Sequence, residues 1–144
     1  MTALNTERDT PQYNDGPLAV VLSIPMQAAT KCYAGGLTCV DATGQAVPGQ
    51  VSSTLIAVGR CRRTTDNSAG AAAAINVDVE RGVFKFDQFA TAPGADLITQ
   101  AMLLTPCYVV DDATVAATNG GGTRSRAGII VRIEADGVFV QVGA

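Results

Sequence analysis

The sequence contains no histidine and no tryptophan, and only two of its ten basic residues are lysines. Without histidine, the Ser-His-Asp and Cys-His arrangements of nucleophilic enzymes are excluded. Lys31 and Lys85 remain as candidates for amine chemistry, but Lys31 follows a turn-like pattern and Lys85 falls on the polar face of a predicted strand. We interpret both lysines as surface charges, and the sequence predicts neither an enzyme nor a cofactor site.

Charged residues make up only 16% of the chain, and the net charge is −3. No apolar run approaches the roughly 20 residues that a membrane-spanning helix needs. Arg60, Arg62 and Arg63 form a tight basic group, but no basic stripe of the kind used for nucleic acid exists. The group is either a solvated strand edge or an interfacial cluster that faces an acidic partner. We predict no binding to nucleic acid or membranes.

The cysteines lack the CxxC spacing of structural zinc sites, and no histidine could complete such a site. The N-terminal residues show no positively charged region followed by an apolar stretch, so we expect synthesis in the cytoplasm, where thiols stay reduced. We predict four buried free thiols, at Cys32, Cys39, Cys61 and Cys107.

What the chain does have is 47% hydrophobic residues, most of them small, in short segments separated by glycine-rich turns. Its 144 residues fit one domain with one core. Residues 1–17 are polar and without periodicity, which is typical of a flexible arm. The sequence therefore predicts an all-β fold, a small antiparallel β-barrel or sandwich over residues 18–144, preceded by a flexible N-terminal arm.

Alternation of apolar and polar residues marks the clearest strand, in which Ile75, Val77 and Val79 share one face. After a turn or bulge at residues 81–82, Phe84 and Phe86 are predicted core residues. The other predicted strands are 18–24, which suits burial on both faces, 37–40, 55–61, 108–110, 114–116, 129–133 and 138–142, the last two joined by a hairpin at 134–137.

One helical turn is predicted over residues 96–102, with Asp96 as its N-cap, whereas residues 71–74 are too few to nucleate a helix and are predicted to be loop. Residues 93–97 also resemble the Ala-Gly-x-Asp-Leu element of trimeric all-β dUTPases. The chain lacks the Gly-Arg-Ser-Ser segment and the C-terminal Phe-Gly-Ser-Thr-Gly arm of those enzymes. A single short match without its context does not assign that activity.

Two polar segments invite chemical interpretations. Asp111 and Asp112 are adjacent, and adjacent strand residues point to opposite faces, so we favour an Asx-type turn over a metal site or an acid–base pair. Residues 120–125 lack the Gly-Lys-Ser/Thr ending of phosphate-binding loops. We interpret them as a mobile loop tip whose three glycines can adopt positive φ.

Six segments of the chain follow one another in an order that is informative: residues 33–37, 46–49, 66–70, 75–87, 107–112 and 119–128. Each is common by itself, but their order and spacing from about Ala28 onward resemble the small capsid decoration, or cement, proteins of tailed bacteriophages. The resemblance implies a small, β-tulip-like protein that assembles as a homotrimer at three-fold positions on the outer surface of an expanded head. There it would clamp neighbouring major capsid protein subunits against the pressure of packaged DNA.

The resemblance implies no catalysis and no cofactor, and it implies a virion protein made in the cytoplasm of the host bacterium. The arm departs most from the family pattern. A head-fibre or receptor-binding module, and a tail-tube or head-completion subunit, stay open as alternatives. The arm and the glycine-rich loop are the predicted contacts with the major capsid protein, with these candidate residues: Glu7, Arg8, Asp9, Tyr13, Arg124 and Arg126.

Overall fold

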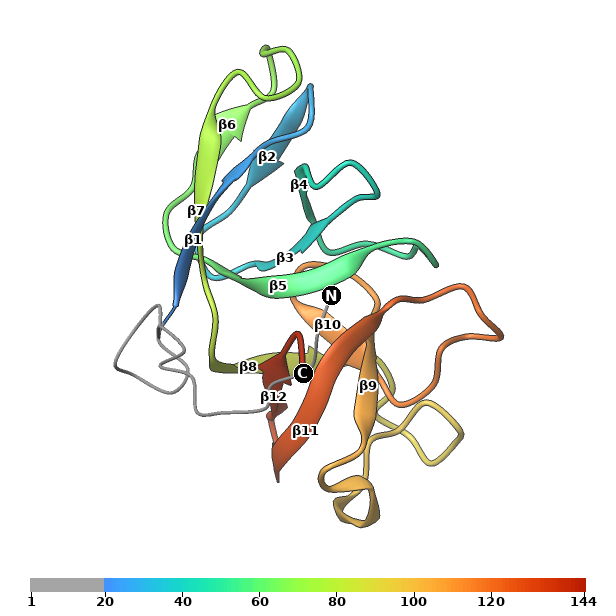
Figure 1. Cartoon of the computed structure of the whole chain (residues 1–144). Coiled ribbons are helices and arrows are strands. Elements are labelled where there is room, and N and C mark those ends of the chain that lie inside the picture. The colour runs from blue at the N-terminus through green and yellow to red at the C-terminus, as the bar shows by residue number, and fades with distance from the viewer. Residues whose placement is uncertain (1–19) are drawn as a thin grey trace, which may run out of the picture.

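The computed structural model describes residues 20–144, which form twelve strands and a single turn of 3-10 helix (Figure 1). The predicted all-β fold class is confirmed. The helical turn, η1, covers Gln100–Met102. No helix in residues 20–144 has the length and apolar character that crossing a membrane requires.

The first half of the chain forms an antiparallel five-stranded sheet. Its strands, in spatial order, are β1 (Val21–Pro25), β7 (Asn76–Glu80), β5 (Ile56–Cys61), β3 (Leu37–Val40) and β4 (Ala46–Pro48). A parallel bridge between Met26 and Ala46 joins the two edges, so the sheet curls back on itself. Two further strands, β2 (Thr30–Cys32) and β6 (Thr65–Asn67), pair with each other beyond its end.

The second half closes into a five-stranded barrel. The order around it is β10 (Thr114–Ala116), β8 (Val83–Gln88), β12 (Gly137–Val142), β11 (Arg126–Glu134) and β9 (Pro106–Val109). All neighbours are antiparallel except β8 and β10, so the predicted antiparallel barrel carries one parallel pair. The predicted hairpin is confirmed, because β11 and β12 pair up to Glu134 and Gly137.

Two hydrophobic clusters fill the molecule. The larger lies inside the barrel and against β3 and β5, and the smaller lies inside the curled sheet. The strands β3 and β5 contribute to both clusters. In β5, for example, Ala57 packs in the larger cluster and Cys61 in the smaller one. Because most side chains in both clusters are aliphatic residues or cysteine, the pleated strands pack closely, and Phe86 is the one buried aromatic residue of the described chain.

Several sequence predictions need correction. Residues 18–24 were expected to be buried on both faces, but the described part, β1, is an edge strand and only Ile24 is buried, because β7 is its one ladder partner. Phe86 is buried as predicted, but Phe84 is only half-buried and lies under the Arg60 guanidinium, 4.2 Å from it. Asp96 does not cap η1, whose N-cap is Thr99, because its carboxylate is used elsewhere.

Candidate functional site

The glycine-rich loop before β11, residues 119–125, forms a hydrogen-bonded turn. Gly120, Gly121 and Gly122 have φ values of 63°, 74° and 93°, which confirms the predicted positive φ. The backbone N–H groups of Thr123 and Arg124 both donate to the Asn119 carbonyl, each at 2.9 Å. These donors are used within the loop itself, so they are not arranged to cradle a phosphate.

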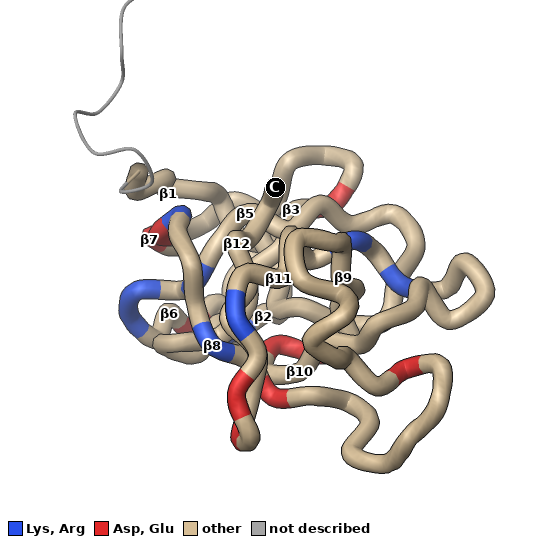
Figure 2. Tube along the Cα trace, turned by 90° about the horizontal axis from the view of Figure 1, so that it is seen from below, with Lys and Arg blue, Asp and Glu red and all other residues tan. Residues whose placement is uncertain are grey.

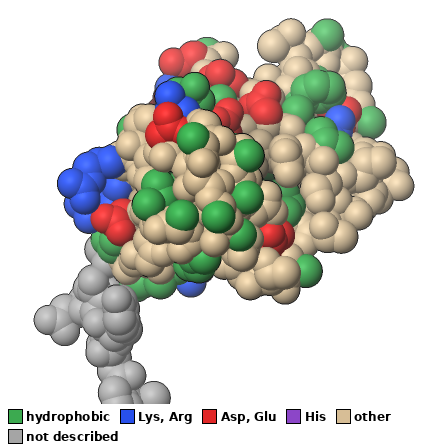
Figure 3. Space-filling model, turned by 90° about the horizontal axis from the view of Figure 1, so that it is seen from above, with side chains coloured by type: hydrophobic (Ala, Val, Ile, Leu, Met, Phe, Trp, Pro, Cys, Tyr) green, Lys and Arg blue, Asp and Glu red, His purple; other side chains and the backbone are tan. Residues whose placement is uncertain are grey.

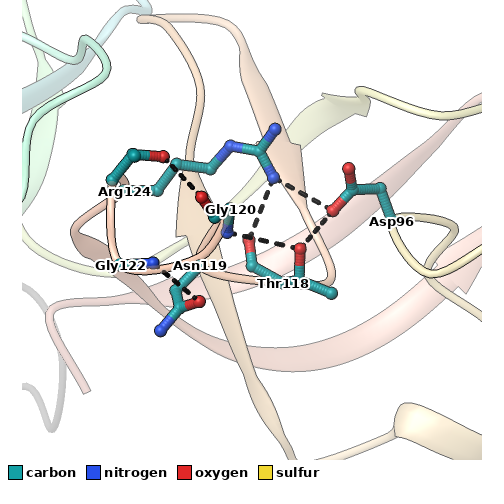
Figure 4. Close-up of polar contacts among 7 residues, drawn as sticks. Asp96, Thr118, Asn119, Gly120, Gly122 and Arg124 are labelled. Atoms are coloured by element: carbon teal, nitrogen blue, oxygen red, sulfur yellow. Dashed lines mark hydrogen bonds and ion pairs between the residues drawn. The ribbon is translucent and has the colours of Figure 1, made fainter.

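Arg124 is held inside the protein rather than extended from it, with its side chain 12% exposed. Its Nη1 donates to Asp96 Oδ1 at 3.0 Å and to the Thr118 carbonyl at 3.1 Å (Figure 4). Its guanidinium also lies 4.9 Å from the centre of the Phe89 ring. A partly buried, multiply bonded guanidinium fixes a loop more than it recruits a partner. The predicted role of Arg124 as a capsid contact remains a prediction.

Asp96 is the anchor of this network. Its Oδ1 accepts hydrogen bonds from the Thr118 hydroxyl and from Arg124. The Thr118 hydrogen bond first, and then Arg124, lower the pKa of this carboxyl below its ordinary value. Asp96 therefore ties the segment before η1 to the glycine-rich loop, a contact between residues 28 positions apart.

Arg126 lies two residues further along and faces a different environment. Ser125 between them is buried, donates its hydroxyl to the Ser52 carbonyl and accepts the Leu55 N–H at 3.0 Å. No local pattern marks Ser125, because its two partners lie 70 and 73 positions away in the sequence. Arg126 itself is exposed and forms no ion pair within residues 20–144. It remains available to an external partner.

The basic group around β5 is partly neutralised. Arg60 pairs with Glu80 at 2.9 Å and Arg63 with Asp78 at 3.3 Å, whereas Arg62 is exposed and unpaired within the described residues. The strand-edge interpretation is wrong for Arg60, because β5 lies between β7 and β3. Figure 2 shows the basic turn after β5 well separated from the acidic β11–β12 hairpin. An interfacial role for the group stays a prediction.

The chemically reactive groups occupy structural positions. Asp111 Oδ1 accepts the Ala113 N–H at 2.8 Å, which confirms the predicted Asx-type turn. Lys85 Nζ contacts Asp136 at 2.6 Å and Glu134 at 3.1 Å, and these bonds raise the pKa of the amine, the opposite of what a nucleophilic lysine needs. In residues 20–144, no group of three or more Cys, Asp or Glu is placed to hold a metal.

All four cysteines are free and buried, as predicted. Burial raises the pKa of Cys32, Cys39 and Cys107 to about 12, so these thiols stay protonated at neutral pH. Burial also raises the pKa of Cys61. A protonated, inaccessible thiol is a poor nucleophile, so the cysteines act as small apolar core residues.

Exposed apolar side chains are the feature that the fold does not explain. Figure 3 shows apolar side chains spread over one face of the molecule, beside a group of basic ones. Two sites stand out among the described residues. Leu103, Leu104 and Val131 are exposed on two neighbouring segments, which the hydrogen bond from the Leu104 N–H to the Ile130 carbonyl joins, and we term these three residues the Leu104 patch. Ile56, 64% exposed, lines a second site.

The four predicted contacts in the arm, Glu7, Arg8, Asp9 and Tyr13, lie outside the described residues. Comparison with protein-family models, with curated proteins and with solved structures found no match to this chain.

Proposed function

We propose that the protein is a structural virion protein, a capsid decoration or cement protein that binds as a homotrimer to the outside of a phage head and stabilises the lattice of the major capsid protein. The ordered segments that resemble this family support the proposal. So does the all-β body, in which every buried side-chain nitrogen and oxygen atom of residues 20–144 has a hydrogen-bond partner.

The segments that carry the resemblance build the body of the protein. Asn67 is buried and donates its amide to the carbonyls of Gln27 at 2.8 Å and Ala71 at 3.0 Å. A Cβ at Gly70 would lie 1.8 Å from Asn67 Oδ1, so this turn requires glycine. Residues of this kind specify a shape and not a reaction, which agrees with a structural role.

The observation that carries the proposal is Leu104. This residue is 68% exposed and has a φ of 64°, the left-handed region that costs a leucine about 1 kcal/mol. Neither burial nor backbone preference explains a leucine at this position. A partner surface that covers the Leu104 patch would explain it, because burying such a side chain contributes about 2 kcal/mol.

A receptor-binding module would need an exposed aromatic platform. Among the large apolar residues exposed in the structure, the aromatic ones are Tyr33 and Phe89. Each already has a cation over its ring, Lys31 at 4.9 Å and Arg124 at 4.9 Å. This arrangement favours the capsid role over the receptor role.

The test mixes the purified protein with expanded, undecorated heads and follows their thermal disruption, after light scattering has measured its mass in solution. We expect a trimer that binds and raises the disruption temperature. Leu104→Asn removes the apolar side chain and suits the positive φ, so it should weaken binding about tenfold while leaving the unfolding temperature unchanged or higher.

Ile75→Asn is the matched control, because Ile75 is also exposed but belongs to the loop before β7. It should bind heads as the natural protein does. A protein that ignores heads and forms larger rings, or that binds carbohydrate, would replace this proposal with the tail or receptor alternative.

A further inference from the structure

An apolar groove crosses β5 near the point where the described chain begins. Two adjoining hollows, of about 170 and 140 Å³, share Ile56 and form what we term the Ile56 groove. Its apolar lining includes Leu22, Leu55 and Val58, and arginines stand at its two ends, Arg81 in one hollow and Arg126 in the other.

The groove exists because β5 is only half covered on one side. The ladder between β5 and β7 consists of the pairs Arg60–Glu80 and Cys61–Val79, so the Ile56–Val58 half of β5 has no paired strand there within residues 20–144. The C-terminal residues approach instead, and a Cβ at Gly143 would lie 2.9 Å from the Ala57 carbonyl oxygen. Figure 2 shows the C-terminus beside β5 and β12.

An arginine lies at each end of the groove. Arg81 and Arg126 are exposed, and neither forms an ion pair with another described residue. An apolar floor with a guanidinium at each end fits a segment that carries both apolar and acidic residues.

Residues 1–19 carry both apolar and acidic residues, and the chain that follows them begins at one end of the groove. They include three acidic residues and one basic residue, together with Leu4, Tyr13 and Leu18. The Arg81 N–H donates to the Val20 carbonyl at 2.8 Å, so the segment leaves the described fold beside the groove. Nineteen residues in extended form can reach about 60 Å, far more than the groove needs.

We propose that the Ile56 groove is the docking site for residues 1–19 of the same molecule, with Ile56 covered by apolar side chains and Arg126 paired with an acidic residue. Attachment at the groove gives the segment a high effective concentration there, which favours its own arm over that of a second copy. Arg126 and the arm, predicted separately as capsid contacts, then contact each other in the free protein.

The test is limited proteolysis of the full-length protein by trypsin. Arg8 is the only trypsin site before Lys31, so the cleavage rate after Arg8 reports how often the arm is free. Ile56→Asp and Arg126→Glu should each accelerate this cleavage about tenfold. Both positions are exposed, so the variants are expected to fold, and circular dichroism would verify this.

Two matched controls make the same chemical changes outside the groove. Val51→Asp alters an apolar residue that is 57% exposed, and Arg62→Glu alters an exposed, unpaired arginine. Neither should change cleavage after Arg8. The proposal fails if Ile56→Asp cleaves no faster than Val51→Asp. It also fails if cleavage after Arg8 becomes faster when the protein is diluted, because the groove would then be occupied by the arm of a second copy.

Discussion

At the scale of single residues, Asn67 is the polar side chain on which the fold depends most. Its buried amide satisfies two carbonyls that belong to different turns. Asn67→Ala takes from the Gln27 carbonyl its one donor among the described residues and leaves the Ala71 carbonyl with only the Ala74 N–H, so we expect the free energy of unfolding to fall by about 2–4 kcal/mol. Urea denaturation measures this. Asn76→Ala, at an exposed site, is the control and should change the value by less than about 0.5 kcal/mol.

Asp96 gives a pH-dependent prediction. Its pKa in the folded protein is lowered, so its carboxylate stabilises the fold above the unfolded value of about 3.9 and loses that effect as the pH falls below it. Asp96→Asn should therefore be less stable than the natural protein at pH 7, and the difference should shrink below about pH 4. A difference that stays constant down to pH 3 would show that the charge on Asp96 contributes nothing.

At the scale of elements, the barrel depends on close approach between β11 and β12. A Cβ at Gly128 would lie 2.0 Å from the Gln141 carbonyl oxygen, and Gly128 pairs with strands on both sides. Because Gly128 has a paired strand on each side, the strands cannot move apart to relieve the clash. Gly128→Ala should therefore destabilise the protein by about 2–3 kcal/mol. The same change at Gly94, where the nearest atom is 4.0 Å away, should cost less than about 0.5 kcal/mol.

At the scale of the whole molecule, the two hydrophobic clusters share β3 and β5, so we expect them to unfold together. The thiols report this directly, because Cys39 and Cys107 lie in the larger cluster and Cys32 and Cys61 in the smaller. Reaction with Ellman's reagent at pH 8 should proceed in one phase, at least about a hundredfold slower than in concentrated urea. Two thiols reacting ahead of the other two would show that the smaller cluster opens first.

Features that depend on neighbouring residues could be predicted from the sequence alone. Alternation placed Val77 and Val79 in the core, and the polar loop before Gly137 specified the hairpin. Three consecutive glycines adopted the positive φ that other residues avoid, and Asp111 capped its own turn. These are local effects of side-chain period and backbone sterics, so they can be predicted without knowing which strands pair.

Features that depend on residues far apart in the sequence became visible only in the folded chain. Three of the four three-residue strands, β2, β4 and β6, were not predicted, because so short a strand depends more on its partner than on its own pattern. Arg124 was predicted to be a contact residue on a loop, but in the fold its guanidinium binds Asp96 and lies over the Phe89 ring. The Ile56 groove arises because β7 leaves half of β5 uncovered. Pairing between residues far apart in sequence sets each of these features, and no local period encodes it.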